Sequence, residues 1–386
     1  MKLSKKSPPW LDQDLLAQEL AKKGCSLSEP EFSKVIDSLE SVLAEAVRNE
    51  KNRRRVRRND AEKHSWPAAE VLSEEQLSKL PEWVLSQLDD SVVVGTSRKV
   101  VQVPDGRKFH LGNALNELSG AEWTFFLNSV LSTRYATAGP DSFAHHIRKI
   151  HPSPKPPQLM RGIIEFFTKS DELVLDYFMG VGGTLLGASL ANRRAVGIDL
   201  SSKYIDAYKA AANELKLAEQ QTIVGDAMVV LQQPSAHSRL LVPESVSLIA
   251  IDPPYGDMMK REKTGETAKL GGDVSPTPFT DLAADLGNLP IEEFHVRFRE
   301  SVQLAMPLLR NNGHLVVFTK DLQPQGSTPN LLHARIIEEL SLIEGLRYLG
   351  LKVWADLGVN LYPYGYPHAF VANQIHQYIM FFKKVS

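Results

Sequence analysis

Hydrophobic positions follow two different patterns along the chain, and the pattern changes near residue 159. From there onward, short apolar runs alternate with segments whose apolar residues recur every three or four positions. Short apolar runs predict buried strands, and the periodic segments predict amphipathic helices. Strands are expected at 173–176, 195–199, 222–224, 246–251 and 314–319, with two more at 351–354 and 377–382.

Helices are predicted between these strands, at 159–169, 184–191, 201–215, 291–309 and 331–349, the third of them capped by Ser201. Alternating strands and helices indicate an α/β fold with a doubly wound, mostly parallel sheet. The last two strands are expected to form a hairpin, which suits an antiparallel strand at the edge of the sheet.

The first 110 residues show a different pattern, with helical periodicity followed by short alternating segments. Helices are predicted at 10–23, 28–47 and 74–88, the last beginning with a capping box formed by Ser73 and Gln76. Short strands are predicted at 92–94, 99–103 and 107–111, and a further helix at 123–131. We therefore expect an N-terminal helical and small-strand extension over residues 1–110 and an α/β domain over residues 111–386.

The composition excludes several classes of protein. The 386 residues carry a formal net charge of −2, so the chain as a whole is not a basic nucleic-acid binder. The single cysteine, Cys25, excludes an internal disulfide framework and a cysteine-cluster zinc site. No apolar run approaches the ~20 residues of a membrane span, and no signal-peptide core follows the basic N-terminus. A soluble, cytoplasmic protein is expected.

Two local clusters of basic residues stand out against this neutral balance. Six of the eight residues at 51–58 are basic, which is typical of a solvated helix end but also suits contact with phosphates. The segment 134–160 is also rich in basic residues, histidines and prolines. The candidate phosphate contacts are Arg53, Arg54, Arg55, Arg57, Arg58, Arg148 and Lys149.

Histidines also gather in the second basic segment, at His145, His146 and His151. Their spacing does not repeat, and no carboxylate or thiolate stands with them as a metal ligand would. We therefore expect no metal site here.

The stretch V-L-D-Y-F-M-G-V-G-G-T at 174–184 predicts a ligand-binding turn. A strand ending at Asp176 is followed by glycines, which let the backbone turn tightly and approach a ligand, and then by a helix that begins near Thr184. The G-x-G-x-x-G dinucleotide pattern fails at its third glycine, and no G-K-[ST] follows. An adenosine ligand without a pyrophosphate fits this turn better than a dinucleotide, although any glycine-rich turn of an α/β protein would share part of the pattern.

Acidic residues stand at the ends of the first four predicted strands of the sheet. These are Asp176, Asp199, Asp226 and Asp252. The carboxyl ends of parallel strands line one crevice, so the four carboxylates should converge there. Asp199 is placed to accept hydrogen bonds from ribose hydroxyls.

The most specific signal is I-D-P-P-Y-G at 251–256. Two successive prolines hold the backbone rigid and leave no N–H donors, so the Asp252 side chain and the Pro253 carbonyl can act together as acceptors. Two acceptors that face one point suit an exocyclic NH₂ group, and the ring of Tyr255 offers a surface on which a planar base could stack. The alternative is an ordinary tight turn with a packed tyrosine.

Together these stretches resemble the motifs of the amino-group S-adenosylmethionine-dependent DNA methyltransferases, the N6-adenine/N4-cytosine class. The glycine stretch resembles their D-P-F-x-G-x-G-T motif, D-P-P-Y at 252–255 resembles their catalytic motif, and H-P-S-P-K-P at 151–156 resembles their H-P-x-x-K-P motif. The resemblance covers roughly residues 134–320. Tyr177 departs from the pattern, because the family usually has proline there.

The resemblance implies a Rossmann-like class I methyltransferase fold and S-adenosyl-L-methionine as cofactor. It places the cofactor contacts at Lys155, Pro156, Asp176, Phe178, Gly180, Gly182, Thr184, Asp199 and Asp226, with Lys155 and Pro156 near the methionine end. It places the target base at Asp252, Pro253, Pro254 and Tyr255. A base in duplex DNA would have to be flipped out to reach them.

Several points stay open at this stage. Adenine N6 is favoured over cytosine N4 as the target, and guanine N2 of tRNA is a rival because those enzymes also carry D-P-P-Y-G. A non-catalytic, cofactor-binding DNA subunit is a further alternative. Target recognition would fall to residues 1–110, to the loop 257–290 as a lid or recognition element, or to the C-terminal part. There the aromatic turn at 362–368 either stacks on nucleic acid or faces the core. A homodimer, partner subunits, and a role in restriction–modification or phage defence are all compatible.

Overall fold

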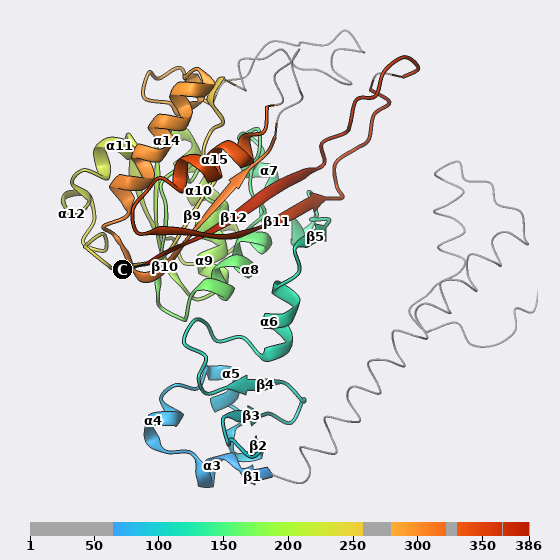
Figure 1. Cartoon of the computed structure of the whole chain (residues 1–386), viewed down its shortest axis with the longest axis vertical. Coiled ribbons are helices and arrows are strands. Elements are labelled where there is room, and N and C mark those ends of the chain that lie inside the picture. Colours follow the sequence, from blue (N-terminus) through green and yellow to red (C-terminus); the bar gives the residue numbers. More distant parts are fainter. Residues whose placement is uncertain (1–64, 258–278, 322–329, 365, 386) are drawn as a thin grey trace, which may run out of the picture. The chain divides into compact units, whose positions relative to one another are not determined.

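The computed structural model describes residues 65–257, 279–321, 330–364 and 366–385. It divides into two compact units, residues 1–111 and residues 112–386 (Figure 1). The predicted helices at 10–23 and 28–47 lie outside the described residues.

The described part of the first unit is a small four-stranded antiparallel sheet with short helices. Its strands follow one another in the order β1 (Ser65–Pro67), β2 (Val92–Val94), β3 (Val100–Gln102) and β4 (Lys108–His110). Its helices are α3 (Ala68–Val71), α4 (Glu74–Leu77), α5 (Glu82–Leu85) and a 3₁₀ turn at Leu88–Asp90. A small core of its own, which includes Val84, Val101 and Phe109, holds these elements together.

The helix predicted at 74–88 was wrong in its extent. The capping box of Ser73 and Gln76 is present, but α4 ends at Leu77 and α5 begins after Pro81. Proline lacks the N–H that a continuing helix needs, so the segment breaks into separate turns.

An eight-stranded sheet forms the centre of the second unit. Its order is β5 (Val130–Thr133), β11 (Leu346–Asp356), β12 (His376–Lys384), β10 (Leu309–Thr319), β9 (Val246–Ile251), β6 (Leu173–Asp176), β7 (Arg194–Asp199) and β8 (Gln221–Val224). Neighbouring strands are parallel except where β12 pairs antiparallel with β10 and β11. The predicted doubly wound, mostly parallel sheet is confirmed.

The position of the antiparallel strand differs from the prediction. β12 lies inside the sheet between β10 and β11, whereas β5 forms the edge beside β11. The apolar segment at 123–131 was predicted as one helix, but it contains the end of α6 (Gly120–Phe126) and the start of β5. Tertiary pairing of Val130 with Val353 of β11 therefore overrides the helical pattern.

Helices cover both faces of the sheet. One face carries α8 (Pro157–Phe167), α9 (Gly183–Leu190) and α10 (Ser202–Glu214), whose apolar residues share one core with Phe318 and Ile379 of the sheet. The other face carries α11 (Ala227–Val230), α14 (Ile291–Ala305) and α15 (Leu332–Leu340) around a second core (Figure 1). Shorter helices are α7 (His145–Arg148) and α12 (Pro234–His237), with 3₁₀ turns at Pro140–Ser142 and Leu286–Asn288.

Three details of the predicted helices need correction. The segment 331–349 holds α15 only as far as Leu340. Gly345 then turns the chain at a φ of +75°, and β11 begins at Leu346. Ser201 is at the N-cap position of α10, but its side chain makes no capping hydrogen bond. Similarly, α14 ends at Ala305 rather than at 309, where β10 begins.

Candidate active site

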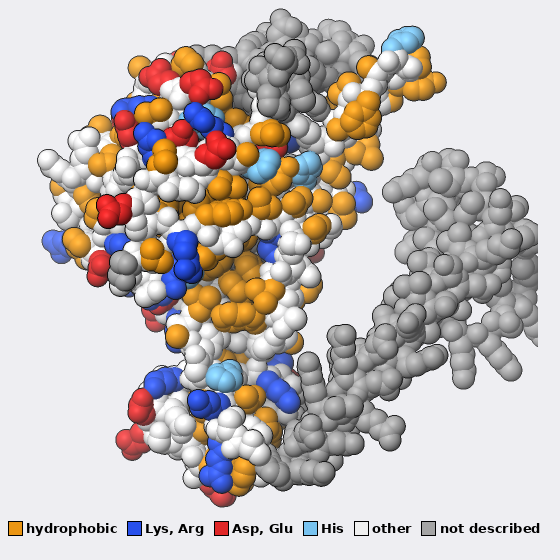
Figure 2. All heavy atoms as spheres, in the orientation of Figure 1, with side chains coloured by type: hydrophobic (Ala, Val, Ile, Leu, Met, Phe, Trp, Pro, Cys, Tyr) orange, Lys and Arg blue, Asp and Glu red, His pale blue; other side chains and the backbone are white. Residues whose placement is uncertain are grey.

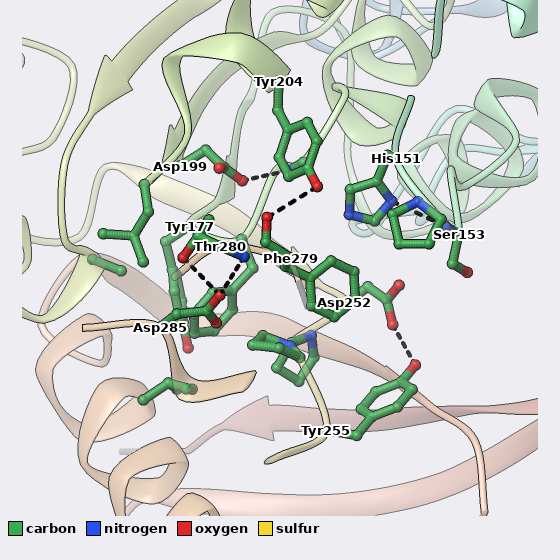
Figure 3. Close-up of a pocket in the computed structure, with 18 of the residues that line it drawn as sticks. His151, Ser153, Tyr177, Asp199, Tyr204, Asp252, Tyr255, Phe279, Thr280 and Asp285 are labelled. Atoms are coloured by element: carbon green, nitrogen blue, oxygen red, sulfur yellow. Dashed lines mark hydrogen bonds between the residues drawn. The ribbon is translucent and has the colours of Figure 1, made fainter. Parts of the chain in front are cut away.

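A cavity of about 900 Å³ lies at the carboxyl ends of the parallel strands. Residues that end or follow five of these strands line it: Tyr177 and Phe178 after β6, Asp199 on β7, Asp226 after β8, Asp252 after β9 and Lys320 after β10. Figure 3 shows Asp199 and Asp252 on opposite sides of this cavity. Three of the four predicted strand-end carboxylates, Asp199, Asp226 and Asp252, thus line this cavity, as expected for an open parallel sheet.

Asp199 is held by backbone donors. Its Oδ2 accepts a hydrogen bond of 2.8 Å from the Gly180 N–H, and its Oδ1 accepts one of 2.8 Å from the Ser201 N–H. Burial raises the pKa of Asp199 to about 6, partly offset by these two hydrogen bonds. The carboxylate thus joins the end of β7 to the glycine turn and lines the main cavity.

Asp176 has a different role from Asp199, since it serves the turn itself. It is buried, accepts a hydrogen bond of 2.5 Å from Thr184 Oγ1 and another of 3.0 Å from the Phe178 N–H. Burial raises the pKa of this carboxyl to about 7. Asp176 and Thr184 line a smaller adjoining cavity of about 40 Å³, together with Lys155, Gly180 and Asp252. A hydrogen bond between strand and helix start keeps the turn in shape.

Two glycines of the turn, Gly180 and Gly182, have different structural roles. Gly180 has a φ of +48° and lines the cavity, and a Cβ there would lie 3.2 Å from His151 Nε2. Gly182 has a φ of +73°, and a Cβ there would lie 2.2 Å from Tyr208 Cδ2 of α10, so this glycine allows close packing and does not line the cavity. Tyr177, the departure from the family pattern, is buried, and its hydroxyl lies 3.5 Å from Ser301 Oγ of α14.

Asp226 and Phe178 complete the predicted end of the cavity. Asp226 is the N-cap of α11, where it accepts a hydrogen bond of 2.8 Å from the Met228 N–H. Phe178 lines both cavities, and its ring packs against Tyr177 with a centroid distance of 4.8 Å. Carboxylates beside an aromatic ring suit a ligand that has hydroxyl groups and a planar base.

Asp252 is engaged on both carboxylate oxygens. Oδ1 accepts a hydrogen bond of 2.6 Å from the Tyr255 hydroxyl (Figure 3), and Oδ2 forms an ion pair with Lys155 Nζ. The side chains of Lys155 and Asp252 are only 9% and 19% exposed, so the pair is largely shielded from solvent. Each carboxylate oxygen has two lone pairs, so Asp252 retains capacity for another donor.

The remaining residues of D-P-P-Y also line the cavity, although Tyr255 is less open than expected. Pro253 and Pro254 lie on the wall. The ring of Tyr255 packs against Leu332 and Ile291 and the residue is 8% exposed, so it is mostly a packed tyrosine with its hydroxyl tied to Asp252. Burial, followed by the charge of Asp252, raises the pKa of Tyr255 well above its ordinary value, so the hydroxyl remains a donor.

His151 occupies a place in the cavity wall that the sequence reasoning did not foresee. Its ring stacks on Phe279 at a centroid distance of 5.1 Å and meets the edge of Tyr204 at 4.9 Å (Figure 3). Burial lowers the pKa of His151 to about 4, so the ring is neutral near pH 7. Within the described ranges, no group of three or more potential metal ligands occurs.

Several predicted site residues lie elsewhere. Arg148 is 1% exposed and donates to the backbone carbonyls of Phe143 and Lys155, so the prediction that it contacts phosphates was wrong. The two hydrogen bonds to those carbonyls offset the cost of burying the guanidinium. They also fix the segment that carries Lys155. Pro156 is the N-cap of α8 and lines neither cavity, whereas Lys149 is exposed. The basic residues Arg53, Arg54, Arg55, Arg57 and Arg58 lie outside the described residues.

Other cavity residues were missed. Phe279, Thr280 and Asp285 come from the described end of the predicted loop, where Asp285 accepts hydrogen bonds from Thr280 and the Gly287 N–H. Lys320 and Asp321 follow β10, Gln374 precedes β12, and Gln377 lies at the start of β12. The rule that strand ends carry the site could have found Lys320, but no signal in the sequence indicated Phe279 or the glutamines.

The segment between β11 and β12 is exposed, which settles one alternative. We call residues 357–375 the arm. It contains no Lys, Arg, Asp or Glu, and Tyr366 and Phe370 are 81% and 94% exposed. Figure 2 shows it as a largely hydrophobic projection, and the interpretation of 362–368 as a core-facing loop was wrong.

Comparison with known families agrees with the chemistry of this site. Residues 32–210 match the sequence model of the DNA methylase family, a span that includes the glycine turn and Asp199 and ends before Asp252. A type II methyltransferase, M1.MboII of Moraxella bovis, is 32% identical over 71 residues, which are 18% of this chain and 27% of that protein. These matches support an amino-methyltransferase of the N6-adenine/N4-cytosine family. Its cofactor is S-adenosyl-L-methionine.

The names of other relatives describe enzymes that act on tRNA. The tRNA (guanine(10)-N2)-dimethyltransferase of Pyrococcus abyssi is 25% identical over 218 residues, 53% of this chain and 59% of that protein. The protein of the same name from Methanocaldococcus jannaschii is 27% identical over 154 residues, 39% of this chain and 42% of that protein. This chain thus spans about half the length of these curated relatives.

Solved methyltransferases of low sequence identity are also similar. The crystal structure of TrmN from Thermus thermophilus matches 65% of this chain and 50% of its own with 16% identity and a TM-score of 0.35. Across the described residues, no helix has the length and apolar character that a membrane crossing requires.

The residues present fit S-adenosyl-L-methionine. The turn at Gly180 and Gly183 leaves no room for side chains, since a Cβ at Gly183 would lie 2.6 Å from the Lys155 carbonyl oxygen. Asp199 and Asp226 would accept from the ribose and adenine, Phe178 would contact the adenosine ring, and the small cavity at Asp176 and Thr184 adjoins Asp252. When bound, the cofactor supplies an activated methyl group on a sulfonium.

Proposed function

We propose that this amino-methyltransferase methylates the exocyclic amine of a flipped base in DNA, with adenine N6 as the acceptor. The observation that carries the proposal is the position of Asp252. It lines both the main cavity and the small cavity under the glycine turn, so an amine held there lies next to the methyl donor. The DNA methylase match and the similarity to a type II methyltransferase support DNA as the substrate.

The chemistry follows from the acceptors on the chain. The two N–H groups of the amine donate to the Asp252 carboxylate and the Pro253 carbonyl, which directs the nitrogen lone pair toward the methyl group. As the new N–C bond forms and the S–C bond breaks, the nitrogen becomes positively charged, and the Asp252 carboxylate stabilises that charge. The extra proton then leaves the nitrogen for solvent.

Lys155 and Tyr255 position Asp252 for this task. Because both hold the carboxylate before a base enters, its direction is set in advance. The Lys155 carbonyl is in turn bound by the buried Arg148 guanidinium. Such preorganisation lowers the reorganisation needed during the reaction.

The arm supports a nucleic-acid partner. Gln374, near the C-terminal end of the arm, lines the cavity. The arm therefore connects the cavity to its exposed aromatic residues, Tyr366 and Phe370. Uncharged aromatic side chains suit stacking on bases, whereas phosphates would require Lys or Arg. The exposed Lys149 and the basic residues at 53–58 remain predicted phosphate contacts.

Guanine N2 of tRNA is a second candidate substrate. The similarity to tRNA guanine-N2 dimethyltransferases extends over 218 residues, three times the span that matches the type II methyltransferase. An amine on a guanine would meet the same acceptor pair at Asp252 and Pro253.

The test is to express the full chain in a host without DNA methylation and to sequence its DNA by single-molecule modification detection. N6-methyladenine at a recurring site is expected, and it should disappear with the Asp252→Ala variant. In parallel, purified protein is offered radiolabelled cofactor with duplex DNA or with bulk tRNA. Incorporation into tRNA and none into DNA would reject the DNA assignment in favour of the second candidate.

A further inference from the structure

Lys320 and Gln377 are neighbours at the cavity end of the sheet. The registered pairs of β10 and β12 run from His314 with Lys383 to Thr319 with Tyr378. The next position along each chain is Lys320 on one side and Gln377 on the other, and both residues line the cavity. Side chains opposite each other on antiparallel strands are in reach of one another.

Both residues have polar groups that the described chain does not satisfy. Gln377 Oε1 is buried and has no hydrogen-bond partner. Lys320 is half-buried, and its Nζ makes no hydrogen bond or ion pair with another residue that the structure describes. Burial lowers the pKa of Lys320, and the charge of Lys155 lowers it further. Buried polar groups are normally paired, so unpaired groups on a cavity wall indicate a ligand that pairs them.

The polar side chains around them are already paired. Lys155 and Tyr255 hold Asp252, and the Asp321 carboxylate lies 2.8 Å from His333 Nδ1, whose ring stacks on Tyr378. These groups therefore have internal roles, which leaves Lys320, Gln377 and Gln374 for a ligand on this side of the described cavity, and the first two are neighbours across β10 and β12.

Strand order places this pair on the side of the base. Asp199 and Asp226 belong to β7 and β8, on one side of β9, whereas Lys320 and Gln377 belong to β10 and β12, on the other. Neighbouring strands lie about 4.8 Å apart, so Asp252 at the end of β9 stands between the two sets. A ligand group on the β10 side of Asp252 is the ring of the methyl acceptor rather than the adenosine of the cofactor.

We propose that Lys320 and Gln377 read the ring edge of the target base, with Lys320 donating to the ring nitrogen next to the amine, N1 of adenine. Gln377 lies beside it on the same wall, where its buried Oε1 can accept a hydrogen bond from the Lys320 ammonium and so orient it toward the base. The proposal rests on the proposed function, since it assumes an adenine acceptor. It makes the two residues determinants of base specificity at this site.

The experiment removes the two partners of this hydrogen bond separately and together. Single-turnover methyl transfer is measured with duplex oligonucleotides that carry the methylation site found by sequencing. The target is either adenine or 1-deazaadenine, which keeps the amine and lacks N1. For the wild type, 1-deazaadenine should lower the rate by about 10- to 100-fold, as expected for a hydrogen bond to a charged group. Lys320→Met should lower the rate on adenine by a similar factor and lose most of the sensitivity to 1-deazaadenine.

Two controls separate reading of the base from general damage. Lys203→Met removes an exposed lysine of α10 that lines neither cavity and should behave as the wild type. 7-Deazaadenine keeps N1, so the ratio of the rates on adenine and on 7-deazaadenine should be the same for the wild type and for Lys320→Met. Gln377→Leu should lower the rate on adenine and leave cofactor affinity within about threefold, a change of less than 1 kcal/mol.

Two results would count against the proposal in different ways. If the wild type methylates adenine but Lys320→Met keeps its full sensitivity to 1-deazaadenine, or weakens cofactor binding instead, the reading role is rejected and the proposed function stands. If the wild type transfers no methyl group to DNA, the proposed function fails and the assignment of adenine N1 fails with it.

Discussion

The proposed cofactor end and the proposed base end of the cavity are built in different ways. At the cofactor end, contacts join residues close in sequence: Thr184 binds Asp176, and Gly180 binds Asp199. At the base end, Lys155 binds Asp252 across 97 residues, and Lys320 meets Gln377 only because β12 pairs with β10. The first end is a local motif, whereas the second joins the local hydrogen bond from Tyr255 to Asp252 with partners that only the assembled sheet brings to it.

This difference explains where each end is vulnerable. A change in the glycine turn alters one compact hydrogen-bonded unit, which should affect cofactor binding. A change at the base end alters groups held by distant partners, which should affect the transfer step. Measurements that separate cofactor affinity from turnover therefore test the comparison directly.

The largest effect is expected for Asp252→Ala. It removes the acceptor for the amine and leaves Lys155 without its partner, so single-turnover methyl transfer should fall by about 10³-fold or more. Cofactor affinity by calorimetry should stay within about threefold of the wild type. Near-wild-type turnover would show that Asp252 is not needed for methyl transfer and would contradict the assignment of that step to the base end.

The next effect concerns the pH dependence of cofactor binding. Burial raises the pKa of Asp199 to about 6, and only the ionised carboxylate accepts from ribose hydroxyls without competition from its own proton. Affinity should therefore be constant above that pKa and weaken as pH falls below it, by about tenfold between pH 7 and pH 5. Asp199→Asn should bind more weakly at pH 7 and lose most of this dependence.

Calorimetric titrations between about pH 5 and pH 8 measure this. Asp176 titrates in the same pH range, because burial raises the pKa of its carboxyl to about 7. Asp199→Asn keeps Asp176, so it separates the contributions of the two carboxyl groups to the pH dependence. An unchanged slope in Asp199→Asn would assign the pH dependence to another group.

Gly182→Ala tests whether the turn is fixed by packing. A Cβ at this position would lie 2.2 Å from Tyr208 at a φ of +73°, so the variant should lose about 3 kcal/mol of folding free energy. Melting temperature should fall by roughly 5–10 °C in a domain of this size. Gly162→Ala in α8 is the matched control, because a Cβ there meets nothing within 4 Å; equal melting temperatures for the two variants would contradict the packing role.

The smallest effect is expected for the arm. Phe370→Ala should weaken binding to duplex DNA by about 5- to 10-fold, as expected for the loss of one stacking contact. Fluorescence anisotropy measures this, with Leu342→Ala as the control, since Leu342 is a 68% exposed hydrophobic residue outside the arm. A similar affinity in both variants would mean that the arm makes no stacking contact.

The sequence predicted the fold class and the strands whose ends line the cavity, whereas the cofactor contacts stay a prediction. The strand-and-glycine pattern depends on residues near one another, so Asp176, Gly180 and Asp199 lie where the motif indicated. Arg148 shows the limit of that reasoning. A charge in a basic segment was read as exposed, whereas folding buries it against the carbonyls of Phe143 and Lys155.

The base end could not be predicted in the same way. The internal place of β12 depends on pairing that no local periodicity encodes, and Gln377 reaches the cavity only through that pairing. His151 lay in a recognised motif, but its neutral, stacked state depends on Phe279 and Tyr204. Residues whose role depends on long-range neighbours are those that the sequence left open.

The internal position of β12 also has a consequence for synthesis of the chain. Until residues 376–384 leave the ribosome, β10 has one paired edge and one open edge, and an open apolar edge is a template for unwanted strand pairing. The glycine turn can take shape earlier, since β6 and β7 are translated well before. A nascent chain would therefore gain the means to bind its cofactor before it could accept a base.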